Sequence, residues 1–196
     1  MKRWPEAITL SGEYARLELC DQKHADELAE VIAEGALNRL WYTKIPPPEG
    51  ISAEIERRCS LPNMTPFTVI DLRTEKAIGM TTYMNTEAHV PRLEIGSTWL
   101  GKNAQRTPIN TECKLLLLGH AFETLGCIAV EFRTHVVNTQ SRRAIERLGA
   151  KPDGVLRNHM VMANGTIRDT AVYSVINTEW PTVKANLEFQ ITKWRG

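Results

Sequence analysis

The sequence predicts an α/β fold, in which a mixed and largely antiparallel sheet carries helices on both faces. Two observations lead to this prediction. Strand-like segments follow one another through short turns at residues 67–84 and 155–176, and such pairs form antiparallel hairpins. A strand at Glu94, a helix at Thr111 and a strand at Ile128 instead form one right-handed crossover, which joins strands that should be parallel.

The first third of the chain predicts two strands and two helices. Residues 7–20 indicate two strands around a turn at residues 11–13. Asp21 is a good N-cap for a helix whose apolar residues recur at helical spacing. After the stiff loop Pro46–Pro48, a shorter helix is expected from Ser52 to about Cys59.

The remaining elements are predicted by β-branched content, helical periodicity and caps. The strands are expected at 67–72, 76–84, 92–100, 128–133, 155–162 and 167–176, and the helices at 111–125 and 138–148. Asn164-Gly165 favours a type I′ turn between the last two strands. Residues 178–196 are expected to form a C-terminal extension of a single domain spanning 1–196, with a helix and an added strand.

Composition excludes several classes of function. The chain has 196 residues and a net charge of +1, so it has no field suited to nucleic acid or an anionic membrane. No signal peptide or membrane helix is predicted, and a cytoplasmic location follows by default. The four cysteines and five histidines show no metal-ligand spacing, so we expect reduced thiols and no metal.

Three motifs in a fixed order give the chain a family resemblance. They are Glu94-Ile-Gly-Ser-Thr-Trp-Leu100, the loop Gln105–Asn110 before a leucine-rich helix, and Asn138-x-x-Ser141 at the start of the next helix. In this order they resemble the acetyl-CoA core of the GNAT N-acetyltransferases, in the branch that acetylates ribosomal proteins (RimJ/RimL). The resemblance implies a sheet of about seven strands with splayed central parallel strands, acetyl-CoA as cosubstrate and N-acetyltransferase activity.

The resemblance also implies which residues hold the cofactor. The backbone near Trp99 and Leu100 would bind the pantetheine amides, as a ligand strand added to the sheet. The loop would bind the pyrophosphate through Gln105, Arg106, Thr107, Asn110 and Thr111. Pro108 and Asn110 stand where the family has glycines, and Pro108 has no N–H to donate. On the residues alone, an ordinary loop and N-cap that binds nothing explains this segment better, and it is the order of the surrounding motifs that favours a phosphate loop.

At the second helix, the resemblance assigns Asn138 to the pantetheine arm and Ser141 to the thioester sulfur. Arg142 or Arg143 would reach the 3′-phosphate, although a solvated basic helix face explains both equally well. Many family members have a tyrosine at the position of Ile145, which cannot donate a proton, so Ser141 is expected to contact the leaving thiolate.

Acetyl transfer to an amine requires a base, because a free alkyl amine is mostly protonated at neutral pH. Glu94 matches the carboxylate that many family members place on this strand, and an exposed structural glutamate is the alternative. His159 and Glu131 are weaker candidates for the base. No covalent nucleophile is expected, so the implied mechanism is direct attack in a ternary complex.

The acceptor is expected to be a primary amine, whether a small molecule, an amino acid or a peptide N-terminus. Trp41, Tyr42 and His159 are the candidate residues of its pocket, with buried packing as the alternative for the first two. A homodimer is also plausible, because the apolar residues between Trp180 and Trp194 would cover another subunit or the chain's own sheet. The rival functions are a non-catalytic acyl-CoA-binding module and a structural, partner-binding α/β domain.

Overall fold

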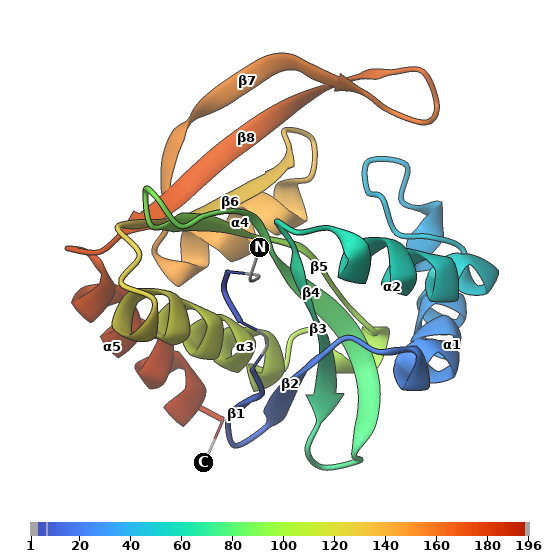
Figure 1. The fold of residues 1–196 in the computed structure, drawn as a ribbon, viewed down its shortest axis with the longest axis horizontal. Coiled ribbons are helices and arrows are strands. Elements are labelled where there is room, and N and C mark those ends of the chain that lie inside the picture. Colours follow the sequence, from blue (N-terminus) through green and yellow to red (C-terminus); the bar gives the residue numbers. More distant parts are fainter. Residues whose placement is uncertain (1–3, 7, 195–196) are drawn as a thin grey trace.

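The computed structural model describes residues 4–6 and 8–194 of the chain. A single eight-stranded sheet forms the centre of the molecule, in the order β1-β2-β3-β4-β5-β6-β8-β7 (Figure 1). Every neighbouring pair is antiparallel except β5 and β6. The strands are β1 (Leu10–Ser11), β2 (Ala15–Leu19), β3 (Thr65–Asp71), β4 (Lys76–Glu87), β5 (Arg92–Leu100), β6 (Ala129–His135), β7 (Lys151–Val161) and β8 (Ile167–Ile176).

Five α-helices cover the two faces of this sheet. They are α1 (Ala25–Gly35), α2 (Ile51–Ser60), α3 (Pro108–Gly119), α4 (Thr139–Leu148) and α5 (Trp180–Thr192). Helices α1 and α2 pack on one face and share a core with Met80 and Trp99 of the sheet. Helices α3, α4 and α5 pack on the other face, around Leu117, Leu148 and Leu187. The predicted α/β class with helices on both faces is therefore confirmed, with eight strands instead of about seven.

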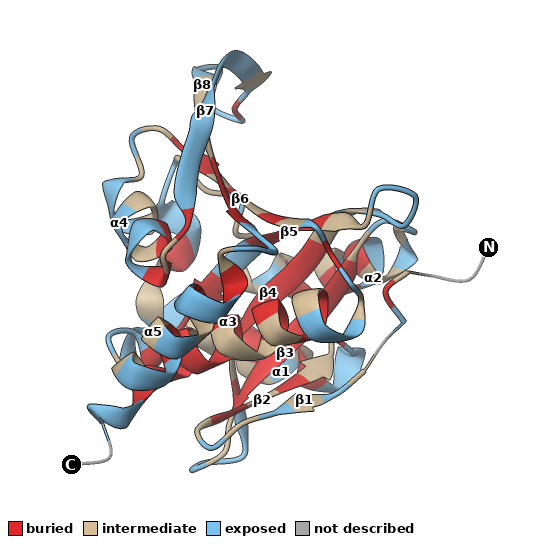
Figure 2. Cartoon of the chain, turned by 90° about the vertical axis from the view of Figure 1, so that its left-hand side faces the viewer, coloured by how far each residue is buried: buried red, intermediate tan, exposed pale blue. Residues whose placement is uncertain are grey.

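The hairpin of β7 and β8 projects from the body of the molecule (Figures 1 and 2). Strand β7 is exposed along almost its whole length, whereas the central strands are buried on both sides. Only the part of β8 that lies against β6 is buried. The outer half of the hairpin therefore contributes little to the core.

The parallel pair of β5 and β6 splits soon after it forms. Arg92, Leu93 and Glu94 pair with residues 129–131, and beyond Glu94 the two strands no longer pair. Both strands nevertheless continue, β5 to Leu100 and β6 to His135. The backbones of β5 and β6 therefore separate beyond Glu94, which agrees with the predicted splayed strands; the region between them is called the opening below.

Three local predictions need correction. Helix α3 begins at Pro108 and not at Thr111, because Pro is well suited to the first helical position and Thr107 provides the cap. The β7–β8 turn is not type I′, since only Gly165 has a positive φ and Asn164 instead accepts bonds from Thr166. The C-terminal extension contains one helix and no added strand in the described residues, because Val183, Leu187 and Ile191 pack inward at helical spacing.

Helix α5 packs mainly on the chain's own helix α3, and not on the sheet as predicted. Phe122 stacks on Trp180 at this contact, with ring centroids 5.5 Å apart. A homodimer stays a prediction.

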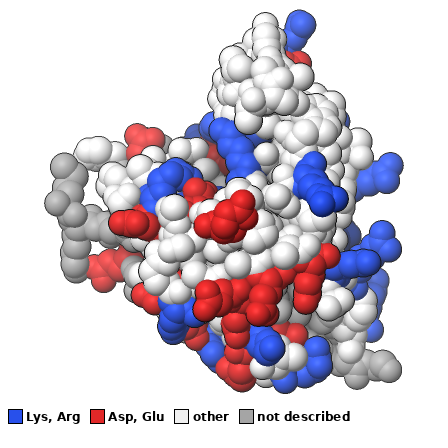
Figure 3. Space-filling view, turned by 90° about the vertical axis from the view of Figure 1, so that its right-hand side faces the viewer, with Lys and Arg blue, Asp and Glu red and all other residues white. Residues whose placement is uncertain are grey.

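The surface that carries α1 and α2 has mixed charges, with acidic side chains gathered in its lower half (Figure 3). Helix α1 carries four acidic residues, Asp26, Glu27, Glu30 and Glu34. This face therefore has no continuous basic surface of the kind that binds nucleic acid. No helix within residues 4–6 and 8–194 has the length and apolar character needed to cross a membrane.

Candidate active site

The opening between β5 and β6 presents polar backbone and a threonine to solvent. Strand β5 has a bulge here, where Ser97 takes a positive φ of 48° and the register with β4 shifts. Ser97 and Thr98 are exposed although they lie in the middle of the sheet. Beyond the split, the edge of β5 that faces β6 has no strand partner. Its N–H and C=O groups are therefore available to a ligand that lies along the strand.

A buried lysine lies beneath this opening. Lys114 of α3 is 5 % exposed, and its Nζ donates to the Thr98 hydroxyl at 2.8 Å and to the Thr81 hydroxyl at 3.2 Å. No carboxylate forms an ion pair with it in the described part of the chain, and burial lowers its pKa to about 8. The group beneath the opening is therefore the ammonium of Lys114, and removing it from water costs free energy.

The loop before α3 is closed by its own side chains. The Gln105 amide donates to the Leu100 carbonyl at 2.9 Å, and the Thr107 hydroxyl donates to the Ala104 carbonyl at 2.7 Å. Thr107 also caps the helix by accepting the Ile109 N–H at 3.3 Å. Arg106 has a positive φ of 61°, and its side chain is exposed to solvent. It is therefore a cation next to this helix end that a ligand can reach.

Glu112 fixes the first turns of α3 to the edge of the sheet. Its carboxylate is buried and accepts the backbone N–H groups of Glu13, Tyr14 and Ala15, each at 2.7 Å. A Cβ on Gly12 would lie only 2.3 Å from the Glu112 carboxyl carbon, so this turn requires glycine. The acidic side chain therefore points toward β1 and β2, where it holds the helix end in place.

The start of α4 lies at the end of β6, on the α3 side of the sheet. The Asn138 side chain caps the helix by accepting the Ser141 N–H at 3.0 Å, as predicted. Arg142 donates to the Tyr173 hydroxyl at 2.9 Å and so ties α4 to β8, whereas Arg143 is exposed. Ile145 is buried, and Ser141, four residues before it, is half-buried.

Glu94 lies where the two parallel strands split, on the α1 and α2 face of the sheet. It is 6 % exposed, accepts the Asn85 amide at 2.8 Å, and lies 3.6 Å from the Arg133 guanidinium. Burial raises the pKa of this carboxyl, and Arg133 opposes the rise. A Cβ on Gly96 would lie 2.7 Å from one Glu94 oxygen, so the glycine leaves room for the carboxylate.

Glu131 is less suited to act as a base. It accepts two bonds from Arg133, at 2.9 and 2.7 Å, and another from Arg92. Three guanidinium N–H groups therefore compete for its lone pairs, whereas Glu94 accepts a hydrogen bond from the Asn85 amide alone among the residues that the structure describes.

The predicted acceptor residues gather beyond the end of β6. Trp41 packs edge-on against His135 at 5.4 Å between centroids and against Tyr42 at 5.7 Å. The exposed His159 of β7 contacts the Thr170 hydroxyl at 2.9 Å, and Thr170 is the cross-strand partner of His135. Trp41 is half exposed and Tyr42 partly so, which means that neither is simply core.

Two predicted side chains face away from the opening. Trp99 packs in the α1 and α2 core, so only its backbone can meet a ligand in the opening. Thr111 is 2 % exposed, which makes its hydroxyl unsuited to a phosphate contact.

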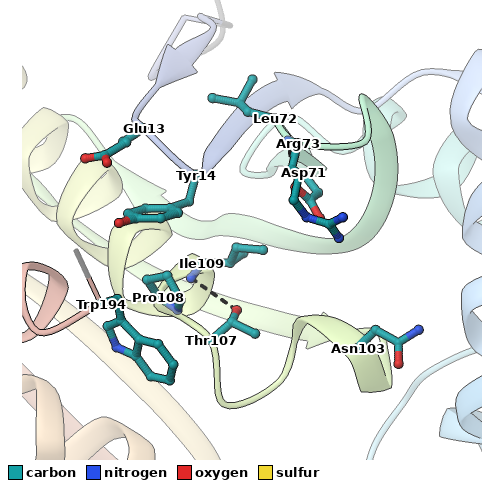
Figure 4. Close-up of a pocket in the computed structure, with 10 residues that line it drawn as sticks. All are labelled: Glu13, Tyr14, Asp71, Leu72, Arg73, Asn103, Thr107, Pro108, Ile109 and Trp194. Carbon is teal, nitrogen blue, oxygen red and sulfur yellow. Dashed lines mark hydrogen bonds and ion pairs between the residues drawn. The ribbon is translucent and has the colours of Figure 1, made fainter. Parts of the chain in front are cut away.

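A groove of about 370 Å³ lies elsewhere (Figure 4). It is lined by Tyr14, Arg73, Pro108 and Trp194, among others, and by no residue of β6 or α4. It therefore lies beside the N-terminus of α3 but outside the split between the strands.

Sequence reasoning missed Lys114, Asn85, His135 and Arg168. Lys114 precedes Leu117 and Leu118 by three and four residues, so helical periodicity alone would have placed it on the buried face. Asn85, His135 and Arg168 are brought to the site by strand pairing across the sheet, for which the local sequence has no signal.

Four cysteines are free in the structure. Burial raises the pKa of Cys113 to about 12 and that of Cys127 to about 11, so both thiols are protonated at neutral pH. Neither is suited to act as a nucleophile.

Comparison with known proteins gives a consistent result. Residues 16–151 match the family model described as the acetyltransferase (GNAT) domain. The chain is 29 % identical over 180 residues to a Bacillus subtilis (strain 168) protein provisionally named ribosomal N-acetyltransferase YdaF, covering 86 % of this chain and 94 % of that protein.

Solved structures agree with this match. A GCN5-related N-acetyltransferase from Brucella melitensis is 33 % identical with a TM-score of 0.87, over 95 % of this chain and 86 % of that one. Mycobacterium smegmatis RimJ, solved with CoA-disulfide, shares the fold at 17 % identity and a TM-score of 0.79, over 97 % of each chain. Since the family model spans more than half of the sequence, the chain belongs to the GNAT acetyltransferase family, and it is an N-acetyltransferase.

Proposed function

We propose that this protein transfers the acetyl group of acetyl-CoA to a primary amine by direct attack in a ternary complex. The observation that carries the proposal is the split of β5 from β6 beyond Glu94, with the N-terminal ends of α3 and α4 beside it. An extended ligand with amide groups fits such an opening, because it replaces the strand partner that β5 lacks. The backbone of residues 97–100 would bind the pantetheine arm.

The phosphates of acetyl-CoA would lie at the N-terminus of α3, where the helix dipole favours negative charge. Two of the usual donors are absent or occupied there, because Pro108 has no N–H and the Ile109 N–H donates to Thr107. The exposed Arg106 and the partly exposed Asn110 side chain are the groups that compensate. At α4, Asn138 would hold the pantetheine arm and Arg143, rather than Arg142, would be free to reach the 3′-phosphate.

Glu94 is the proposed base. Its pKa is raised by burial, which brings it nearer to that of the amine and makes the carboxylate a better proton acceptor. Glu94 first takes one proton from the ammonium form of the acceptor. The neutral amine then attacks the thioester carbonyl, whose developing negative charge is stabilised by a backbone N–H of the bulged part of β5, and the nitrogen loses its second proton to solvent. The carbon–sulfur bond then breaks, and the thiolate, contacted by the Ser141 hydroxyl, takes a proton from solvent.

A thiol-release assay with acetyl-CoA and a panel of primary amines tests this function. We expect turnover with at least one amine and a loss of about 100-fold or more in kcat for Glu94→Gln, because a positioned general base contributes roughly that much. The pH profile of the wild type should rise through a pKa above the ordinary glutamate value, and this rise should be absent in the variant.

The name of the Bacillus subtilis relative makes the N-terminus of a ribosomal protein one member of the amine panel. A non-catalytic acyl-CoA-binding module predicts acetyl-CoA binding with no turnover of any amine and no effect of Glu94→Gln. A structural domain predicts no acetyl-CoA binding at all.

A further inference from the structure

Four arginines lie on the face of the sheet that carries Glu94, and among the described residues three of them, Arg92 included, have a carboxylate partner. Arg133 donates to Glu131 at 2.7 and 2.9 Å, and Arg58 of α2 donates to Glu54 at 2.7 Å. Arg168 of β8 bonds only to a hydroxyl, with its Nε 2.8 Å from Thr170 Oγ1. No ion pair with a carboxylate of residues 4–6 and 8–194 neutralises it, although the side chain is partly buried.

Register places Arg168 beside His135. Thr170 is the cross-strand partner of His135, and Arg168, two residues earlier on β8, points to the same face as Thr170. The bond between Arg168 and Thr170 agrees with this placement. The positive charge of Arg168 is near enough to His135 to help lower the pKa of the imidazole.

His135 offers a second donor without an acceptor. Its Nδ1 accepts the Val137 N–H at 3.3 Å, and burial and Arg168 lower its pKa, so the neutral ring carries its proton on Nε2. His135 is only 5 % exposed, and its Nε2 is buried with no hydrogen-bond partner in the described structure. Such a group normally costs about 1–3 kcal/mol, so its presence points to a ligand that accepts the bond.

The neighbouring groups do not supply this acceptor. Asp169, the carboxylate next in sequence, accepts the Asn158 N–H of β7 at 2.8 Å. The Trp41 ring packs on His135 and remains 50 % exposed, so it forms a wall over the imidazole without satisfying it. Glu94 acts on Arg168 only electrostatically, with no ion pair between them.

We propose that Arg168 and His135 form a subsite for a carboxylate of the acceptor, so that the substrates are amines that also carry a carboxylate. The proposal rests on the proposed function, because Glu94 must take the proton from the amine of the same molecule. The cationic end of such an acceptor lies at Glu94 and its anionic end lies at Arg168 and His135. A guanidinium beside an imidazole N–H is a suitable pair of donors for two carboxylate oxygens.

The test compares acceptors that differ only in the carboxylate. Each free amino acid is assayed against its own amide, and peptides with Asp at the second position are assayed against the same peptides with Asn, all with saturating acetyl-CoA. We expect the carboxylate member of one of these two sets to be favoured at least about 10-fold in kcat/KM, because a buried donor left unpaired penalises the amide. The set that shows the preference identifies the source of the carboxylate.

Arg168→Gln should reduce this preference to less than about 3-fold, mainly through KM, while acetyl-CoA binding measured by calorimetry stays unchanged. Arg73→Gln, in the β3–β4 turn, is the matched control and should keep the wild-type preference. Thermal unfolding shows whether both variants are folded.

Equal rates on carboxylates and amides, or a preference that survives in Arg168→Gln, would overturn the subsite. Acetyl-CoA binding with turnover of only uncharged or cationic amines would also overturn it while leaving the acetyl transfer intact. Failure of the wild type to bind acetyl-CoA would instead overturn the proposed function itself.

Discussion

Replacing Glu112 with glutamine tests how the cofactor end of α3 is held in place. The carboxylate accepts three backbone N–H groups, two on one oxygen and one on the other. A glutamine keeps one carbonyl oxygen, so it can retain two of the bonds at most, and its amide group faces the third N–H donor.

The cost can be worked from these contacts. Losing one charge-assisted bond costs about 1.5–3 kcal/mol, and turning the other two into neutral bonds costs about 1 kcal/mol each. The free energy of unfolding should therefore fall by about 3–5 kcal/mol. For a domain of this size, that corresponds to a decrease in Tm of roughly 10 °C.

Thermal and urea unfolding, followed by circular dichroism, measure this change. Glu56→Gln is the matched control, since Glu56 is exposed on α2, and it should shift Tm by less than about 2 °C. A Glu112→Gln protein as stable as the control would show that the three N–H groups do not depend on this carboxylate, and would refute the reasoning.

Two further changes probe the buried polar groups. Lys114→Met should raise the free energy of unfolding at pH 7 by about 1–2 kcal/mol, because the fall in pKa from 10.5 to about 8 corresponds to about 3 kcal/mol, partly offset by the lost hydroxyl bonds. The cost of burying the charged Lys114 is fully present below pH 8 and is lost as pH rises toward 10.5. The stabilisation by Lys114→Met, measured by urea unfolding, should therefore be smaller at pH 9.5 than at pH 7. A variant less stable than the wild type at pH 7 would contradict this. Gly96→Ala should lower kcat by at least about 10-fold with little change in acetyl-CoA affinity, because the new Cβ would lie 2.7 Å from a Glu94 oxygen and displace the proposed base. Wild-type kcat in Gly96→Ala would show that the position of Glu94 does not matter.

Local signals predicted the elements well where a single residue decides the conformation. Asn138 caps α4 and Gly149 ends it with a φ of 103°, as the preferences of asparagine and glycine require. Threonine is a good N-cap and proline is favoured at the first helical position, so Thr107 and Pro108 indicate the correct start of α3. The prediction instead followed the family motif and started the helix at Thr111.

The chemistry of the site was less predictable, because it depends on distant contacts. The alternation of apolar and polar residues along β5 would be the same whether or not β6 paired with it. This alternation therefore cannot show that the pairing ends at Glu94. At Lys114 two signals conflict, because helical periodicity places the residue on the buried face of α3 whereas a lysine usually faces solvent; the structure shows that it is buried. Arg168 and His135 are 33 positions apart in the sequence and become neighbours through strand pairing.

The central claim is that acetyl-CoA binds in the split between β5 and β6, with its phosphates at the start of α3. Calorimetric titration of acetyl-CoA into the wild type and Arg106→Glu tests it most directly, with Lys76→Glu, an exposed charge reversal at the start of β4, as the control. We predict tight binding by the wild type and Lys76→Glu, and binding weakened at least about 10-fold by Arg106→Glu, because a charge-assisted phosphate contact becomes a repulsion. Equal affinity of all three proteins would contradict the phosphate site, and no binding by folded wild type would contradict the account as a whole.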